Sequence, residues 1–444
     1  MKKAVAVLIM LSMVFCLFSC SGNGGNDLTN EITEKLAETV SGSVESTTEE
    51  NVPDVSATEN PLHNGLSATP KISAVVTADF GFRMLKQAVS QQTNALISPV
   101  SLITALAMTA NGASGKTLEE MERVLGAGIE TLNKNFSSDS FKADGVKLAN
   151  SVWFKNASKN DLVINDTFVN TVQNIYGAEM FGKKFDSETV RDINRWVSKN
   201  TDGLINNMLS EIPPEAVIYL INTVLFDAEW EYPYTQSDVH KNQIFTAENG
   251  EKQAVTMLNS TGNSWDYFGL GKAEGIVRRY KNGYSFAAIL PYEGVSISAA
   301  LNSFTGSDFV KAVNPTKIYP TCATGIYPIN ISLPKFEFEC KFTLSDTLID
   351  MGMPTAFLSK EADFTKMGTS WVGNIFIGEV YHNTYIRLDE LGTKAGAATV
   401  IEMKAESEPY FEKTIEFNRP FIYVIYETET GAPLFIGTVR DFEK

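Results

Sequence analysis

The side chains that most often perform enzymatic chemistry are few in this sequence and widely separated. There are three histidines, His63, His240 and His382. The sequence has no G-x-S-x-G nucleophile motif, since the nearest stretch, residues 368–373, has the wrong spacing. It also lacks an H-E-x-x-H motif and paired cysteines with the spacing of metal ligands. We therefore expect a protein that is not an enzyme and that needs no cofactor or metal.

One segment comes close to a phosphate-binding loop. Residues 110–117 read Ala-Asn-Gly-Ala-Ser-Gly-Lys-Thr, but Ala110 replaces the usual first glycine. That motif also follows a strand, whereas Ser98 followed by Pro99 predicts a helix that starts there and continues through an apolar run. The segment is therefore interpreted as a turn between two helices, the second starting at Gly115 or Thr117.

Residues 390–409 have an alternating pattern. Every charge from residue 393 onward lies in one parity set, and the other set is Thr393, Ala395, Ala397, Thr399, Ile401, Met403 and Ala405. Alternate side chains of a strand point to opposite faces, so one face of this segment suits a core. Its first half is Gly, Ala and Thr, too small to be held in a sheet by side-chain packing alone. The pattern is compatible with an exposed loop and with a central strand.

Predicted helices and strands alternate along the chain before and after residues 390–409. Apolar spacing predicts a helix from residue 74, and further helices at 192–205 and 344–353. Strands are predicted at 147–154, 217–226, 276–291, 331–339, 375–385 and 420–426. We expect an α+β chain with no linker between residues 74 and 444.

Several segments resemble blocks of the serpin family, in serpin order. The hinge-like run 392–399 is similar to the start of a serpin reactive-centre loop, and the other blocks are 98–101, 150–153, 193–197, 222–226 with Trp230, 333–336, 351–357, 417–421 and 434–439. The resemblance covers roughly residues 74–444. It implies the serpin fold: a large central β-sheet A, sheets B and C, about eight or nine helices and an exposed reactive-centre loop.

The resemblance also implies a function, the inhibition of serine and possibly cysteine endopeptidases as a suicide substrate. In serpins the cleaved loop enters the central sheet and traps the acyl-enzyme. Counting from Glu390 as in inhibitory serpins puts the reactive bond at Glu406-Ser407, with Lys404-Ala405 as the alternative. The implied hinge is Glu390, Gly392, Thr393, Ala395, Gly396, Ala397, Ala398 and Thr399. Lys394 and Asp227 depart from the family pattern, but neither belongs to the inward-facing set.

A polar patch beneath the central sheet is implied as well. By position, the serpin shutter corresponds to Ser98, Ser101, Asn222 and His382, and the breach to Trp230. Buried polar groups must be paired, and a paired network can exchange partners when strands separate. His382 is therefore expected to be structural, at the point where the sheet opens.

The N-terminal region is expected to lie outside the fold. Residues 1–20 read as a signal peptide that ends in a bacterial lipobox, with Cys20 as the lipidated residue, and simple secretion remains the alternative. Residues 21–72 read as a flexible acidic and polar tether, and residues 73–444 as the serpin domain. We expect a monomer at the outer membrane or cell surface, lipid-anchored or secreted. Whether Cys322 and Cys340 form a disulfide stays open.

Composition agrees with a soluble globular domain, and two further hypotheses remain. The chain has 444 residues, 43% of them hydrophobic, and a net charge of −16, which argues against a nucleic-acid partner. The first alternative is a serpin-fold protein that binds without inhibiting. It would be favoured by bulky or charged residues in the inward hinge set, and that set has none. The second is an unrelated surface-binding lipoprotein, which would leave the ordered blocks unexplained.

Overall fold

The computed structural model describes residues 74–141, 143–156, 162–214, 216–262, 266–313, 329–371, 373–393 and 413–442. All of them belong to the compact unit that spans residues 66–444. Within these ranges the chain forms nine α-helices, α3 to α11, and nineteen strands, β1 to β19. The expected mixed α+β class is confirmed.

Some helix ends follow the local sequence signals and others do not. Ser98 caps α4, because its side chain accepts a hydrogen bond from the Ser101 backbone, and Pro99 occupies the first turn. The predicted helix at 192–205 is wrong in its bounds, since the Asp186 side chain caps it six residues earlier. The helices are α3 (Ala74–Ala88), α4 (Pro99–Ala110), α5 (Gly115–Leu125), α6 (Ile129–Asn135), α7 (Asp166–Tyr176), α8 (Ser187–Asn200), α9 (Ile297–Leu301), α10 (Gly306–Ala312) and α11 (Ser345–Asp350).

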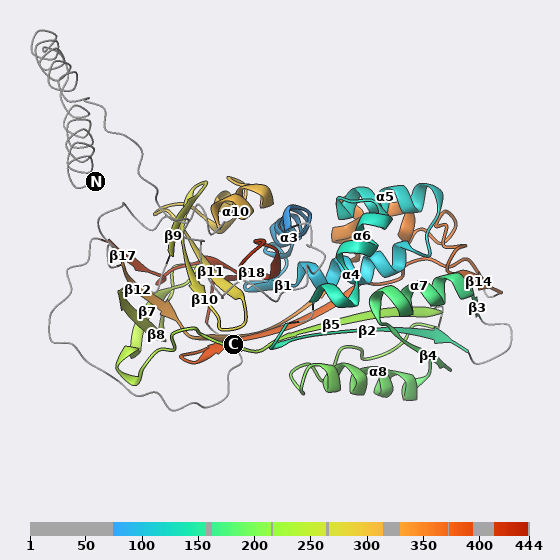
Figure 1. Cartoon of the computed structure of the whole chain (residues 1–444), viewed down its shortest axis with the longest axis horizontal. Coiled ribbons are helices and arrows are strands. Elements are labelled where there is room, and N and C mark those ends of the chain that lie inside the picture. The colour runs from blue at the N-terminus through green and yellow to red at the C-terminus, as the bar shows by residue number, and fades with distance from the viewer. Residues whose placement is uncertain are drawn as a thin grey trace, which may run out of the picture. The chain divides into compact units, whose positions relative to one another are not determined.

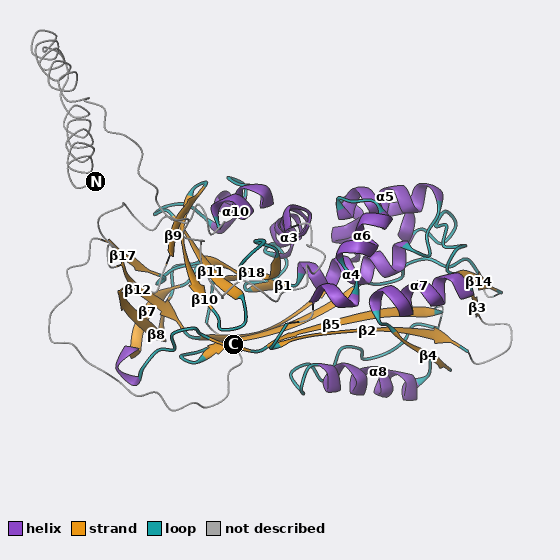
Figure 2. Cartoon of the chain, in the orientation of Figure 1, coloured by secondary structure: helices purple, strands orange, loops and turns teal. Residues whose placement is uncertain are grey.

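A six-stranded sheet forms the most deeply buried part of the domain. Its central strands β11 and β18 are buried along nearly their whole length, as expected for continuous apolar runs. Helix α3 packs against β19 and α10 (Figure 2). The sheet order is β1 (Ala95–Ile97), β19 (Pro433–Val439), β18 (Phe421–Glu427), β11 (Tyr284–Pro291), β10 (Ala273–Arg279) and β9 (Asp266–Leu270).

A four-stranded sheet has β17 and β7 as its edges. The order is β17 (Lys413–Glu416), β12 (Ile329–Pro334), β8 (Lys252–Gly262) and β7 (Val239–Thr246). Strand β17 pairs in parallel with β12. It is the first element after residues 394–412, which lie outside the described ranges.

Two further sheets contain the longest strands of this part of the domain. One has the order β4 (Glu179–Lys183), β2 (Val146–Lys155) and β5 (Ile218–Phe226). The other has the order β13 (Phe336–Thr343), β15 (Tyr381–Leu388), β16 (Gly392–Thr393) and β6 (Ala228–Glu229). Helices α4 to α7 lie on one side of β2 and β5, and α8 lies on the other (Figure 1). A short pair, β3 (Leu162–Ile164) and β14 (Gly368–Ser370), completes the described strands.

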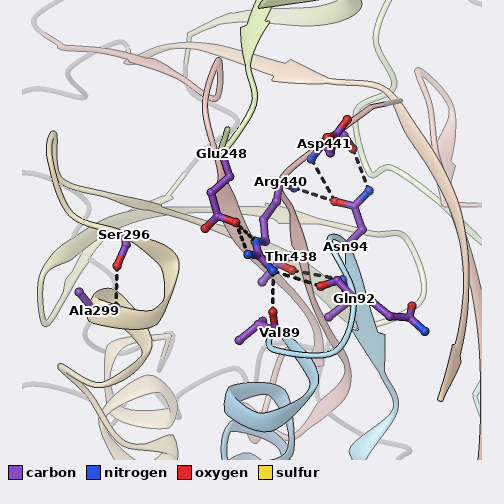
Figure 3. Close-up of polar contacts among 10 residues, drawn as sticks. Val89, Gln92, Asn94, Glu248, Ser296, Ala299, Thr438, Arg440 and Asp441 are labelled. Carbon is purple, nitrogen blue, oxygen red and sulfur yellow. Dashed lines mark hydrogen bonds and ion pairs between the residues drawn. The ribbon is translucent and has the colours of Figure 1, made fainter. Parts of the chain in front are cut away.

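The end of the described chain is fastened by Arg440. Its guanidinium donates to the Glu248 carboxylate, with Nε at 2.6 Å, and to the backbone oxygens of Val89 and Gln92 at 2.7 and 3.1 Å. The Asn94 side chain accepts from the Arg440 backbone at 2.7 Å (Figure 3). These contacts join β19 to the residues after α3 and to the turn between β7 and β8.

Candidate strand-insertion site

Gly392 and Thr393 form a two-residue strand, β16, that pairs with another strand on each of its sides. In β16, Thr393 pairs with Leu388 of β15 on one side and with Ala228 of β6 on the other. A Cβ on Gly392 would lie 2.1 Å from the Ala228 oxygen, so only glycine permits this close approach. Thr393 is 3% exposed, and a hydrogen bond of 2.6 Å joins its Oγ1 to the Tyr280 hydroxyl.

An aromatic platform supports this hinge. Trp230 is fully buried and stacks on Tyr280 with ring centroids 4.3 Å apart. Its Nε1 donates to the Asp389 oxygen at 3.0 Å, and its backbone N–H donates to the Leu391 oxygen at 2.9 Å. Trp230 thus holds the turn that leads from β15 into β16.

The start of the turn carries an ion pair. Lys335, between β12 and β13, pairs with Glu390. Burial opposes ionisation of Glu390, but the hydrogen bond and charge of Lys335, a backbone hydrogen bond and the charge of Arg387 together outweigh it and hold the pKa of the carboxyl below its usual range. The Tyr234 backbone N–H also donates to the backbone carbonyl oxygen of Glu390 at 2.9 Å.

Below Thr393 the two sheets part. A narrow hollow lined by Val224, Ile386 and Thr393 continues the line of β16 between β5 and β15. It is followed by a cavity of about 400 Å³, bounded by residues 216–222 on one side and 374–383 on the other. Leu102, Ala105 and Leu106 of α4 contribute to its lining. We call the hollow and the cavity together the slot.

Three of the four predicted shutter residues are joined by hydrogen bonds, and two of them, Ser101 and His382, line this cavity. The Ser98 backbone N–H donates to His382 Nε2 at 3.0 Å, and the Ser98 hydroxyl donates to the Leu434 oxygen at 2.8 Å. The Ser101 backbone N–H donates to Ser98 Oγ at 3.3 Å. Burial lowers the pKa of His382 to about 3, so the ring is neutral at physiological pH.

Asn222 lines the same cavity but has a different partner. Its Nδ2 donates to Asn150 Oδ1 at 2.6 Å, and Asn150 Nδ2 donates to the Tyr176 oxygen at 2.7 Å. Among the described residues, the buried Asn222 Oδ1 has no hydrogen-bond partner. The structure therefore groups Ser98, Ser101 and His382 directly, and brings Asn222 to the cavity across the slot.

Sequence reasoning missed Tyr280, Lys335 and Asn150. Tyr280 contacts a residue 113 positions later in the chain, and no periodicity signals such a contact. Asn150 belongs to a segment singled out as a strand and as one of the serpin-like blocks, with no role assigned to its side chain. The adjacent polar residues Asn150 and Ser151 in the middle of that strand were the available signal.

Several predicted site residues lie outside the described residues. They are Cys20, Ala395, Gly396, Ala397, Ala398, Thr399, Lys404, Ala405, Glu406 and Ser407. Cys322 does too, whereas Cys340 is a buried free thiol whose pKa burial raises to about 12. Within the described ranges no helix is long and apolar enough to cross a membrane. The same ranges contain no cluster of three His, Cys, Asp or Glu side chains suited to a metal ion.

The chain is similar to proteins of one family along nearly all of the described region. The family model described as "Serpin (serine protease inhibitor)" matches residues 76–442. A serpin-like protein of Thermococcus kodakarensis is 31% identical over 389 residues, which cover 84% of this chain and 86% of that protein. Mouse alpha-2-antiplasmin is 28% identical and is covered over 68% of its length, against 79% of this chain.

Solved structures give the same result. The native state of the thermophilic serpin tengpin is 41% identical, with a TM-score of 0.75, and the match covers 83% of this chain and 94% of that one. Human thyroxine-binding globulin shares the fold at 22% identity and a TM-score of 0.73, with 85% of this chain and all of that one covered. The chain therefore belongs to the serpin family.

Proposed function

We propose that the protein inhibits serine or cysteine endopeptidases as a suicide substrate. The protease nucleophile attacks the Glu406 carbonyl, the Glu406–Ser407 bond breaks, and Ser407 leaves as a free amine. The loop, still esterified to the protease through Glu406, then enters the slot between β5 and β15. Lys404-Ala405 is the alternative bond.

The observation that carries this proposal is the pairing of Gly392 and Thr393 at the head of the slot. Leu388 opposite Thr393, and Ala228 on the other side, define an antiparallel register for any further residues. Continued residue by residue, that register would bring Thr399 between His382 and Asn222. Ile401 and Met403 would then lie against the apolar cavity below.

Energetics favour the same outcome. A new strand of about ten residues gains ladder hydrogen bonds of roughly 0.5–1.5 kcal/mol each, or on the order of ten kcal/mol in total. That is comparable to the stability of a whole domain, and suffices to displace and distort a tethered protease. The inward set from Thr393 to Thr399 is small, so the first residues to enter need little space.

The test is to mix the soluble domain with a panel of serine and cysteine proteases. A complex that survives a denaturing gel, with the loop cut at one bond found by sequencing, is the expected result. Cleavage of the loop with no stable complex for any protease would overturn the proposal. The non-inhibitory alternative, illustrated by the serpin fold of thyroxine-binding globulin, would then take its place.

We further propose that residues 1–20 are a signal peptide, that Cys20 anchors the protein by lipid, and that residues 21–72 are a tether to the domain at 73–444. Multiple acyl chains would hold it at a membrane more stably than one. The variant Cys20→Ser should leave the membrane fraction and lose acyl labelling. Continued sedimentation with membranes would refute the lipobox interpretation.

A further inference from the structure

Trp371 is the most exposed of the large apolar side chains that the structure describes. It is 75% exposed, whereas the other three described tryptophans, Trp153, Trp196 and Trp230, are at most 7% exposed. Burial of so large a ring stabilises a fold, and a tryptophan that stays in water forgoes this gain. Such a side chain marks a candidate contact surface.

Trp371 does not stand alone, because Val163 lies beside it on a short two-stranded ribbon. Val163 of β3 is 53% exposed and pairs with Thr369 of β14, which is exposed too. Trp371 directly follows β14, two residues after Thr369, which is the spacing of side chains that share a face. Leu162 and Ile164 alternate with Val163 and pack against the core. We call Val163, Thr369 and Trp371 the ribbon face.

The ribbon is fastened to the helices beneath it by Asn165, the residue between β3 and α7. The Asn165 side chain donates to the backbone oxygens of Thr365 and Lys366, at 2.9 Å each. Its backbone N–H donates to the Met367 oxygen at 3.0 Å. These bonds hold the segment that leads into β14, so Trp371 is presented by a supported element of the fold.

The ribbon lies at one end of the described domain. Figure 1 shows β3 and β14 at the far right, past the ends of β2 and β5, and the sheet that contains β17 at the opposite end. Strand β17 is the first described element after residues 394–412. A surface that meets the ribbon face therefore leaves the end with β17 pointing away from it.

The chemistry of the ribbon face suits the interface of a lipid bilayer better than a protein partner. Two large side chains present far less than the roughly 800 Å² that each partner buries in a stable protein interface. A bilayer needs no matching shape, and its interface accommodates tryptophan, whose ring is apolar and whose N–H is polar. Lys366, exposed two residues before β14, adds a cation of the kind that anionic headgroups attract.

The proposed anchor supplies the proximity that so small a contact needs. Residues 21–72 give 52 positions (72 − 21 + 1) between Cys20 and the domain. A flexible chain of this length spans about 40 Å on average. It keeps the domain near the membrane at an effective concentration on the order of millimolar. The net charge of −16 opposes binding to an anionic surface from bulk solution, so the anchor is what makes the contact possible.

We infer that the ribbon face of Val163, Thr369 and Trp371 rests on the membrane to which the chain is anchored. The inference rests on the lipid anchor under the proposed function, and it is independent of protease inhibition. The contact orients the domain, because the end that carries β17 then faces the solvent from which a protease approaches.

The test uses the full mature chain, coupled through the Cys20 thiol to a maleimide lipid. The vesicles are phosphatidylcholine with a minor fraction of phosphatidylglycerol. Trp265→Phe and Cys322→Ser form the background, and Cys340 is buried and does not couple. Coupling holds the chain at the membrane whether or not cells acylate Cys20. The result is therefore separate from the Cys20→Ser experiment and from any protease assay.

Two readouts report the contact. In the coupled parent we expect the Trp371 emission to shift to shorter wavelength and to be quenched by lipids spin-labelled near the headgroup. We also expect the backbone amides of β3 and β14 to exchange hydrogen more slowly on vesicles. Trp371→Ser should abolish the shift and the quenching and should reduce this protection about tenfold, because one large aromatic side chain no longer leaves water.

The other variants separate the ribbon face from surface aromatics in general. Val163→Ser should reduce the protection less than Trp371→Ser, and Trp371→Phe, which keeps an apolar ring, should retain most of it. The matched control is Tyr232→Ser, which removes a 62% exposed ring that follows β6 near the hinge, and it should match the parent.

Three results would overturn the inference. The first is a coupled parent with no shift and no quenching. The second is equal protection of β3 and β14 in the parent and in Trp371→Ser. The third is protection of the ribbon without vesicles that rises with protein concentration, because the ribbon face would then bind a second copy of the chain.

Discussion

The two ends of the slot differ in how they are closed. At the hinge, β16 bonds to β15 and to β6, and Trp230, Tyr280 and Thr393 are all buried. At the level of His382 and Asn222, the strands that carry them belong to separate sheets and face a cavity of about 400 Å³. The turn from β15 into β16 places the first two residues of a strand, Gly392 and Thr393, between β15 and β6. The residues that follow, 394–412, lie outside the described ranges.

The difference shows how an unfinished sheet can be kept stable. Closure at the hinge needs only small residues and backbone pairing, which Gly392 and Thr393 supply. Farther down, β5 and β15 belong to separate sheets, and buried polar groups there are unfavourable unless they are hydrogen-bonded. The His382 ring is such a group, and its Nε2 accepts a hydrogen bond from the Ser98 backbone N–H.

Insertion of the cut loop into the slot should have the largest effect on the stability of the protein. If the loop is cut between Lys404 and Ser407 by a protease that is not trapped, we expect the melting midpoint to rise on the order of twenty degrees, from roughly ten kcal/mol of new ladder bonds. A nick in an ordinary exposed loop does not stabilise a protein. Calorimetry of cut against intact protein measures the shift, and an unchanged or lower midpoint would show that the slot stays empty.

Substitution of Thr393 at the hinge should have the second largest effect on stability. In Thr393→Arg a charged side chain replaces the buried hydroxyl that contacts Tyr280, and the unfolding free energy should fall by about 3 kcal/mol. The loop should still be cut, but the yield of denaturant-stable complex should fall to near zero. Thr393→Ser keeps the hydroxyl and should cost about 1 kcal/mol. Equal complex yields from the two variants would contradict the assigned hinge.

The buried His382 should make the unfolding free energy of the protein depend on pH in the acid range. The pKa of His382 is about 3 in the folded chain and about 6.5 when unfolded, so between these values the unfolded chain binds more protons. The unfolding free energy should therefore fall as the pH is lowered from about 6.5 toward 3, by at most about 1.4 kcal/mol per pH unit. Above pH 6.5 this contribution is complete and constant. The stability difference between the parent and His382→Gln, measured by denaturant titration, should shrink on acidification, and a constant difference would refute the assignment.

The ion pair at the turn should have the smallest effect. The Lys335 and Glu390 side chains are 31% and 36% exposed, so solvent screens their attraction. Lys335→Met and Glu390→Gln should each lower the unfolding free energy by about 1 kcal/mol or less. A double-mutant cycle isolates the pair. A coupling as large as the loss in Thr393→Arg would mean that charge, rather than backbone pairing, closes the hinge.

Local signals predicted most elements, because their causes lie within a few residues of one another. Ser98 and Pro99 predicted the start of α4, the spacing of Phe80, Phe82 and Leu85 predicted α3, and the apolar run 217–226 predicted β5. The predicted strand at 375–385 is wrong in its first half, since β15 begins at Tyr381 and residues 374–380 instead border the cavity. The predicted run 331–339 is two strands, β12 and β13.

By itself the sequence determined the α+β class and the alternation of small residues from Thr393 to Thr399, and it predicted the group of polar residues beneath the sheet. Only the tertiary structure decided that Thr393 is already buried against Tyr280, that Asn222 bonds to Asn150, and that β5 and β15 stand apart. Helix caps and strand alternation depend on neighbours in the chain, which a sequence displays. The pairing of strands and the partner of a buried polar group depend on residues tens to hundreds of positions away, and these are brought together only by packing of the core.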